Sequence, residues 1–215
     1  MIQNVENEGP IKSSTERRGV TAREVVYGVL GLVAGLLVLS GVWLMANRAD
    51  ATAAMPQVTE IFRPASEFEL ETLDGPTVRL SDYRGQIVLL NFWRTDCVPC
   101  RAETPALQQA YSDLKDQGVV IIGVNLFNEE QMRNGGIDTV RQFATLYGVS
   151  YPIALDADSS VAKAYNIAPI PTSYLIDPDG NIRFVRIGEL TTNNVKALVE
   201  VLRQNPKASL GSATG

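Results

Sequence analysis

The sequence contains no histidine and only two cysteines. Without histidine, the usual side chain for proton transfer near neutral pH is missing, so a proton shuttle must use a carboxylate, a tyrosine or a thiol. A zinc site needs four ligands, and two cysteines without histidine leave only carboxylates to complete it, so we expect no metal. Covalent haem attachment requires a histidine directly after the second cysteine, where Arg101 stands. No cofactor is therefore expected.

Lysine and arginine are scattered along the chain rather than clustered, and the formal net charge is −5. A nucleic-acid-binding surface needs a basic patch or stripe. Nucleic acid is therefore not an expected partner.

Residues 25–46 contain no charged side chain over 22 consecutive positions. A helix needs about 20 apolar residues to cross the hydrocarbon core of a bilayer. Tyr27 and Trp43 lie near the two ends of this run, where interfacial aromatic residues belong. A cleaved signal peptide has a shorter apolar region, of about 7–15 residues. We therefore expect a single retained transmembrane helix, although the segment 51–53 also fits a cleavage site.

The orientation of this helix follows from the basic residues near its ends. They closely precede it at four positions, Lys12, Arg17, Arg18 and Arg23, whereas Arg48 alone follows it closely. Such an excess marks the cytoplasmic side. The N-terminus is therefore predicted in the cytoplasm and the chain after Ala46 outside it, in a compartment where disulfides persist.

The two cysteines, Cys97 and Cys100, form a C-x-x-C pair at the junction of two predicted elements. The largely apolar run Ile87–Phe92 predicts a buried strand, and apolar residues at helical spacing after the pair predict a helix that ends at Gly118. Free N–H groups at the start of a helix favour a thiolate. A structural disulfide is the alternative, but a bridge over so short a loop stabilises a fold little. The pair is therefore interpreted as a redox site.

Patterns along the rest of this region predict an α/β unit. Apolar and polar residues alternate on both sides of the turn 73–76, which predicts a β-hairpin. The apolar run 119–124 predicts a second buried strand, parallel to the one predicted over 87–92. The polar segment 125–136 is interpreted as a loop. Further predicted elements are helices over 137–147 and 159–165, an extended piece over 152–155, a hairpin of strands 173–176 and 182–187, and a last helix that begins at Thr191 or Thr192.

These patterns divide the chain into five segments. They are a cytoplasmic tail (1–24), the transmembrane anchor (25–46), a linker (47–64), the folded domain (65–204) and a disordered tail (205–215).

Three motifs, in order, resemble the thioredoxin superfamily. They are F-W-x-x-x-C-x-P-C-x-x-E-x-P at 92–105, P-x-P-T at 169–172 and D-P-D-G at 177–180. With the membrane segment, the chain resembles the TlpA/ResA-like branch of membrane-anchored thiol:disulfide oxidoreductases. The resemblance covers residues 67–202 and implies a thioredoxin-like α/β fold, in which helices flank a central mixed β-sheet. It also implies an N-terminal β-hairpin and a central insertion, for which 125–147 is the candidate.

The position of each cysteine suggests its role. Cys97 precedes the helix, so we expect it to be exposed and to attack client disulfides, while Cys100 lies one turn inside and resolves the mixed disulfide. Pro99 fits the first turn because its missing N–H is not needed there. Glu103 continues the inward stripe of the helix. Spacing alone allows either a buried proton carrier for Cys100 or a solvated first-turn residue, and the family's glutamate at this position implies the buried role.

The resemblance also implies a cis peptide bond before Pro171, which then faces the disulfide. Ile170 would offer an exposed backbone edge to which a client peptide adds as a strand, and Trp93 and Pro99 complete the expected substrate-binding set. Relatives commonly carry tryptophan before the first cysteine, where this chain has Asp96. That carboxylate raises the pKa of the neighbouring thiol, while Arg94 opposes the effect.

The sequence thus predicts an extracytoplasmic thiol:disulfide oxidoreductase that works as a reductant. By resemblance, its clients are proteins with cysteine pairs, such as an apocytochrome c before haem attachment, and a membrane thiol carrier supplies its electrons. One alternative is a thiol peroxidase of the peroxiredoxin type, although Arg94 replaces the threonine that this type needs three residues before the cysteine. Another is a copper-delivery module on the same fold, although such modules also use a histidine.

Overall fold

The structure is a computed structural model that describes residues 22–53, 58–133 and 135–204. The chain divides into two units, Met1–Ala51 and Thr52–Gly215, and the described part of the first is residues 22–51 of helix α1 (Ala22–Ala53). Among the described residues, no helix is both long enough and apolar enough to cross a membrane. The predicted disordered tail, 205–215, and most of the predicted cytoplasmic tail, 1–24, lie outside the described residues.

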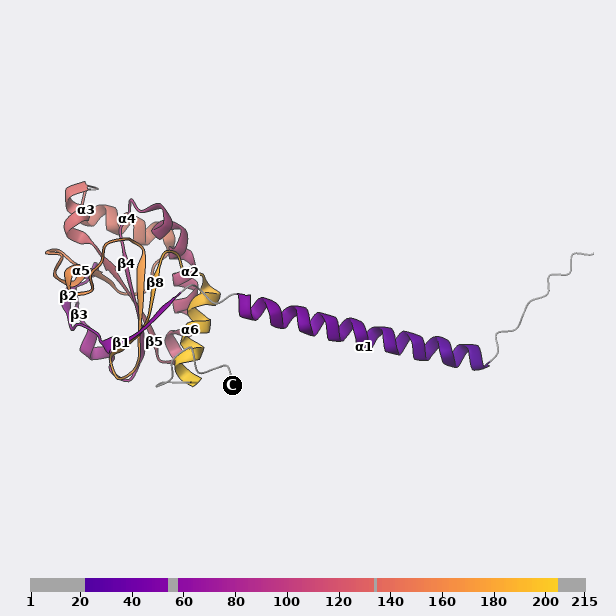
Figure 1. Cartoon of the computed structure of the whole chain (residues 1–215). Coiled ribbons are helices and arrows are strands. Elements are labelled where there is room, and N and C mark those ends of the chain that lie inside the picture. The colour runs from indigo at the N-terminus through magenta and orange to yellow at the C-terminus, as the bar shows by residue number, and fades with distance from the viewer. Residues whose placement is uncertain (1–21, 54–57, 134, 205–215) are drawn as a thin grey trace, which may run out of the picture. The chain divides into compact units, whose positions relative to one another are not determined.

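The second unit is built on a mixed β-sheet, which within the described residues has six strands in the order β1-β8-β7-β4-β5-β6 (Figure 1). The strands are β1 (Thr59–Pro64), β4 (Ile87–Trp93), β5 (Val119–Asn125), β6 (Ile153–Leu155), β7 (Thr172–Ile176) and β8 (Asn181–Ile187). Strand β5 pairs in parallel with β4 and β6, and the other neighbours are antiparallel. The mixed sheet expected from the thioredoxin resemblance is confirmed.

Strand β4 is central because both of its faces are buried. Its side chains alternate between two apolar clusters, with Leu89 and Trp93 in one and Leu90 and Phe92 in the other. A strand that is buried on both faces has a nearly continuous apolar sequence rather than alternating apolar and polar residues. Asn91 is the only polar residue in this strand.

Helices lie on both faces of this sheet (Figure 1). They are α2 (Val98–Leu114), α3 (Phe127–Arg133), α4 (Ile137–Tyr147), α5 (Ser160–Ala164) and α6 (Thr192–Gln204), with 3₁₀ turns η1 (Leu80–Tyr83) and η2 (Lys115–Gln117). Helices α2, α4 and α6 contribute Leu107, Val140 and Leu198 to one cluster. Helix α5 and the antiparallel hairpin of β2 (Glu69–Glu71) and β3 (Thr77–Arg79) contribute Val161 and Val78 to the other. The predicted N-terminal hairpin is therefore confirmed.

Two segments differ from the sequence-based prediction. The segment expected to be a loop, 125–136, contains helix α3, which carries the buried carboxylate of Glu130. The segment expected to be a linker, 47–64, contains the end of α1 and the edge strand β1, whose register pairs Thr59 with Val185 and Pro64 with Asn181. Helix α3 and strand β1 were missed for the same reason, because both are specified by partners distant in sequence rather than by local periodicity.

Gly123 in β5 makes room for the side chain of Trp93. A Cβ atom at this glycine would lie 2.9 Å from Nε1 of Trp93 and 3.0 Å from Cε2 of Tyr151. The tryptophan ring packs in turn on Phe143 of α4, with ring centroids 4.6 Å apart. The close approach of strand and indole therefore fixes how α4 sits on the sheet.

We predict that Gly123→Ala lowers the free energy of unfolding by about 1–3 kcal/mol, the usual effect of overpacking a core. Urea unfolding of the oxidised protein measures it. In a Trp93→Phe background, which lacks the indole nitrogen, the same substitution should have a clearly smaller effect. An equal loss in both backgrounds would contradict this account of the contact.

Candidate active site

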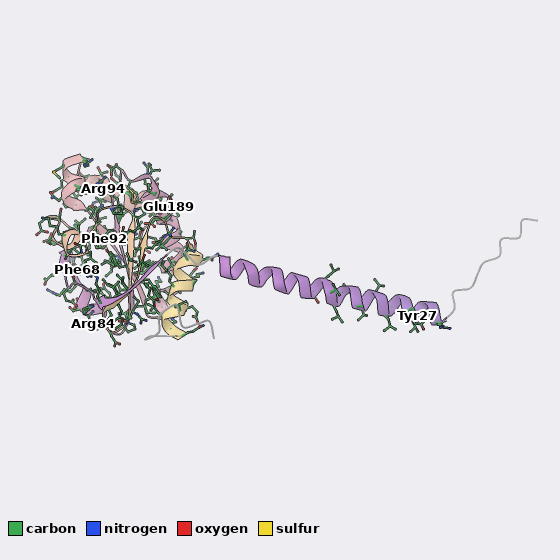
Figure 2. The ribbon with its side chains drawn as sticks, viewed as in Figure 1. Tyr27, Phe68, Arg84, Phe92, Arg94 and Glu189 are labelled. Carbon is green, nitrogen blue, oxygen red and sulfur yellow. A yellow bond between two sulfur atoms is a disulfide. The ribbon has the colours of Figure 1, made fainter. Side chains whose placement is uncertain are left out.

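The two cysteines form a disulfide where β4 gives way to α2. The S–S distance is 2.06 Å, and the Cα atoms lie 5.2 Å apart. Cys97 has extended backbone angles and caps the N-terminus of α2, and Pro99 lies in the first turn. Arg94 lies just before this site in the sequence. In Figure 2, Arg94 and Glu189 lie at one end of the unit, and Arg84 lies at the opposite end. The redox pair therefore lies at the carboxyl end of the central strand, as the sequence predicted.

Helix α2 directs an N–H group at the first sulfur. The backbone N–H of Cys100 donates to Sγ of Cys97 over 3.2 Å. In the reduced protein, the same donor and the positive end of the helix would stabilise a thiolate at this atom. Cys97 is 9% exposed and Cys100 is 0% exposed. The prediction that Cys97 is exposed is therefore wrong for the disulfide form, because the backbone of Ile170 lies beside its sulfur, although Cys97 is the more accessible of the two cysteines.

The peptide bond between Ile170 and Pro171 is cis, as the resemblance implied. Sγ of Cys97 lies 3.8 Å from the carbonyl oxygen of Ile170, so this backbone lies directly beside the disulfide. The carbonyl of Pro171 accepts a hydrogen bond of 2.8 Å from the N–H of Gly188, which ties the loop to the end of β8. Ile170 itself is partly exposed. Its contact with a client stays a prediction.

Glu103 lies one turn after Cys100 on the inward side of α2 and is 2% exposed. Its Oε1 accepts a hydrogen bond of 2.8 Å from Nδ2 of Asn91, and its Oε2 accepts one of 3.0 Å from the N–H of Leu190. Burial raises its pKa to about 7, and these two hydrogen bonds limit the rise. A carboxyl with this pKa exchanges its proton near neutral pH, the task for which the chain has no histidine.

Asn91 is a site residue that the sequence-based prediction missed. Its Nδ2 donates both to Glu103 and, over 2.9 Å, to Oγ of Ser173 in β7. The amide therefore holds the carboxyl of Glu103 against the sheet. The available signal was a single amide within an otherwise apolar strand, because a buried polar group requires a buried partner.

Arg94 and Asp96, which flank the approach to Cys97, form an ion pair. Nε of Arg94 donates to Oδ1 of Asp96 over 2.6 Å, and Nη1 of Arg94 also pairs with Glu129 of α3. Partial burial works to lower the pKa of Arg94, but its hydrogen bond to Asp96 and the charges of Asp96, Glu129 and Glu130 hold that pKa above its usual value. One guanidinium is therefore paired with two carboxylates, those of Asp96 and Glu129, and it also lies in the field of Glu130.

Trp93 is 3% exposed and lies in the core rather than on the surface. Its Nε1 is buried without a hydrogen-bond partner. Its predicted part in substrate binding stays a prediction. Among the described residues, no group of three or more cysteine or carboxylate side chains is placed to hold a metal ion.

Comparison with known proteins agrees with this geometry. Residues 61–185, more than half of the chain, match the AhpC/TSA family. Thiol-disulfide oxidoreductase ResA of Geobacillus kaustophilus is 38% identical over 139 residues, which cover 65% of this chain and 76% of that protein. ResA of Halalkalibacterium halodurans is 40% identical over 139 residues, which cover 65% of this chain and 75% of that protein.

A solved structure has the same fold. StoA from Bacillus subtilis is 31% identical, with a TM-score of 0.56, over 63% of this chain and 97% of StoA. The chain therefore belongs to the AhpC/TSA family, and it is a thioredoxin-fold thiol:disulfide oxidoreductase similar to ResA.

Proposed function

We propose that this enzyme reduces disulfides of client proteins outside the cytoplasm, held at the membrane by residues 25–46. Its clients would be proteins with cysteine pairs, such as an apocytochrome c before haem attachment. The observation that carries the proposal is the buried carboxyl of Glu103, one turn after Cys100 in α2, with a pKa of about 7. It would serve as the proton carrier for Cys100, the thiol that must be activated in the second half of a reduction.

The reaction proceeds by two exchanges. The thiolate of Cys97 attacks one sulfur of the client disulfide, forming a mixed disulfide and releasing the other client sulfur as a thiolate, which takes a proton. Cys100 then attacks Sγ of Cys97, and its proton passes to the carboxylate of Glu103. The second client sulfur leaves as a thiolate and takes a proton from water. The client gains two electrons, and the enzyme is left with the disulfide of Cys97 and Cys100.

The charges around the disulfide support a reducing role. A thioredoxin-type protein is a strong oxidant when its reduced form is stabilised, chiefly as a thiolate. Here Asp96 and Glu129 place negative charge near Cys97 and share Arg94 as counter-charge. Carboxylates close to a thiol disfavour its thiolate. The disulfide form is therefore favoured relative to a site without these carboxylates, which makes the dithiol a better electron donor.

The sequence of residues 25–46 supports the proposed location, because it carries no charged side chain over 22 positions. The described side chains of α1 include ten large hydrophobic residues that are exposed, between Val26 and Leu39. Contact with lipid would remove this apolar surface from water. An enzyme that donates electrons in an oxidising compartment must also be reduced again. We assign that step to a dithiol carrier in the membrane, whose two electrons would regenerate Cys97 and Cys100.

The proposed reaction predicts which cysteine variant traps a client. Cys100→Ser should accumulate a mixed disulfide with an oxidised peptide of the type C-x-x-C-H, because nothing resolves it, whereas Cys97→Ser should form none. Non-reducing gels and mass spectrometry measure the adduct. A redox titration against glutathione should give a potential well below that of glutathione. A strongly oxidising value would reverse the proposed direction. Peroxide consumption or tight copper(I) binding by the wild type would favour the alternatives.

Glu103 should make stability depend on pH. The folded state keeps this proton up to about pH 7, whereas the unfolded state releases it near the ordinary value of 4.5. The folded state thus binds more protons between these values, and its free energy of unfolding falls as pH rises through them. We expect the wild type to lose about 3 kcal/mol relative to Glu103→Gln between pH 4 and pH 8, measured by urea unfolding of the oxidised proteins.

Catalysis provides the second readout for Glu103. In Glu103→Gln, resolution of the mixed disulfide by Cys100 should slow on the order of 10–100-fold, because general base assistance is lost. Formation of the mixed disulfide at Cys97 should change far less. Stopped-flow kinetics separate the two steps. Equal rates of resolution in the two proteins would remove Glu103 from the mechanism.

The proposed topology predicts which cysteines a membrane-impermeant maleimide reaches. In reduced spheroplasts, Cys97 of the full chain should be labelled without lysis. In a Cys97→Ser, Cys100→Ser background, Ser14→Cys should be labelled only after lysis, since the N-terminus would be cytoplasmic. Labelling of Cys97 only after lysis would place the domain in the cytoplasm and would contradict the proposed location.

A further inference from the structure

We propose that Glu130 is a positioning residue for Cys97. It would act through Thr95 by holding the turn that presents the attacking sulfur to the N-terminus of α2. The inference rests on the thiol:disulfide activity alone, and it is independent of the direction of electron flow and of the membrane location. It assigns a task to α3, a helix that the C-x-x-C motif does not include.

Three consecutive residues before Asp96 are held by the segment 126–130. The N–H of Leu126 donates to the carbonyl of Trp93 over 3.1 Å. Arg94 pairs with Glu129, and Thr95 binds Glu130. These contacts attach the whole approach to Cys97 to the start of α3, so the turn does not depend on its own residues for its shape.

Of the two side-chain contacts, that between Glu130 and Thr95 is the more buried. Glu130 is 0% exposed. Its Oε2 accepts hydrogen bonds of 3.0 Å from the N–H of Thr95 and of 3.4 Å from Nδ2 of Asn125, and its Oε1 accepts one from the hydroxyl of Thr95. A buried carboxyl is tolerated only where such donors compensate its lost hydration. The donors therefore fix Thr95 in one place, since any displacement would leave a buried acceptor unpaired.

The position of Thr95 is passed on to the sulfur by the backbone. The N–H of Cys97 donates to the carbonyl of Arg94 over 3.4 Å, which closes a turn around Thr95. This turn sets where Cys97 caps α2, and its Sγ accepts the N–H of Cys100. A looser turn would weaken that hydrogen bond, and with it the stabilisation of a thiolate at Cys97.

A purely structural role makes a different prediction from a positioning role. If Glu130 only secures α3, removing its partner should lower stability and leave the acidity of Cys97 unchanged. If it positions the sulfur, the thiol pKa must rise, because the helix N-terminus then stabilises the thiolate less. Thr95→Val separates the two cases, because it removes the hydroxyl donor, keeps the shape of the side chain and changes no charge. Glu130→Gln alone does not, because losing a negative charge lowers the thiol pKa and opposes the effect of loosening.

The experiment measures alkylation of Cys97 by iodoacetamide in the reduced full chain as a function of pH, with the alkylated residue identified by mass spectrometry. In Thr95→Val, the profile should move to higher pH by about half a unit, and the rate at neutral pH should fall about threefold in proportion to the thiolate. The exchange equilibrium with glutathione should shift toward the disulfide form. In Glu130→Gln, the further substitution Thr95→Val should have little additional effect, because the two groups act as a pair.

Two control variants keep the outcome interpretable. Thr95→Ser retains the hydroxyl and should keep the wild-type profile. Thr145→Val removes a threonine hydroxyl that bonds the carbonyl of Arg141 in α4, and it should also leave the profile unchanged. An unshifted profile in a folded Thr95→Val would overturn the proposal. So would a shift of equal size in Thr95→Ser, because that variant keeps the hydroxyl, and the effect could then not be assigned to the loss of the hydroxyl donor.

Discussion

The hydrogen bond from the N–H of Cys100 to the sulfur of Cys97 is the contact on which the site depends. It exists because β4 ends and α2 begins within a few residues, so that the first sulfur caps the helix. The rest of the unit holds this junction in place. The sheet fixes β4 on both sides, and α2 packs on its face through apolar side chains such as Leu107 and Ala110. A rigid strand and a rigid helix leave the connecting turn few conformations.

The N-terminus of α2 stabilises a thiolate at Cys97, and negative charge opposes this effect from two directions. On the solvent side, Asp96 and Glu129 share one guanidinium with each other. On the core side, Glu103 is held by Asn91 and the N–H of Leu190, and its pKa of about 7 lets it be neutral or charged at physiological pH. The helix end favours a thiolate and the carboxylates disfavour it. The acidity of Cys97 is therefore a balance, and the dipeptide between the cysteines is only one of the groups that set it.

The sequence was most informative where local pattern and tertiary structure agree. The apolar run of β4, the helical spacing of α2 and the turn residues at 177–180 specify elements that the structure contains. The role of Glu103 could not be decided from its spacing alone, and the buried role was assigned through the family resemblance. Asn91, Glu130 and strand β1 could not be assigned, because each is defined by a partner far along the chain. A polar residue in a strand or an acidic pair in a polar segment does not reveal which donor it will meet.

Helix α3 shows how such a site can vary while its motif stays fixed. It lies between β5 and β6, outside the C-x-x-C motif and outside the proline loop. Through Glu129 and Glu130 it nevertheless contacts the two residues that precede Asp96. Substitutions in α3 can therefore change the position and the charge around Cys97 without altering either cysteine, Pro99 or Glu103. A segment that carries no reacting group then becomes a place where the chemistry of a conserved fold can be adjusted, because the sulfur responds to where its turn is held.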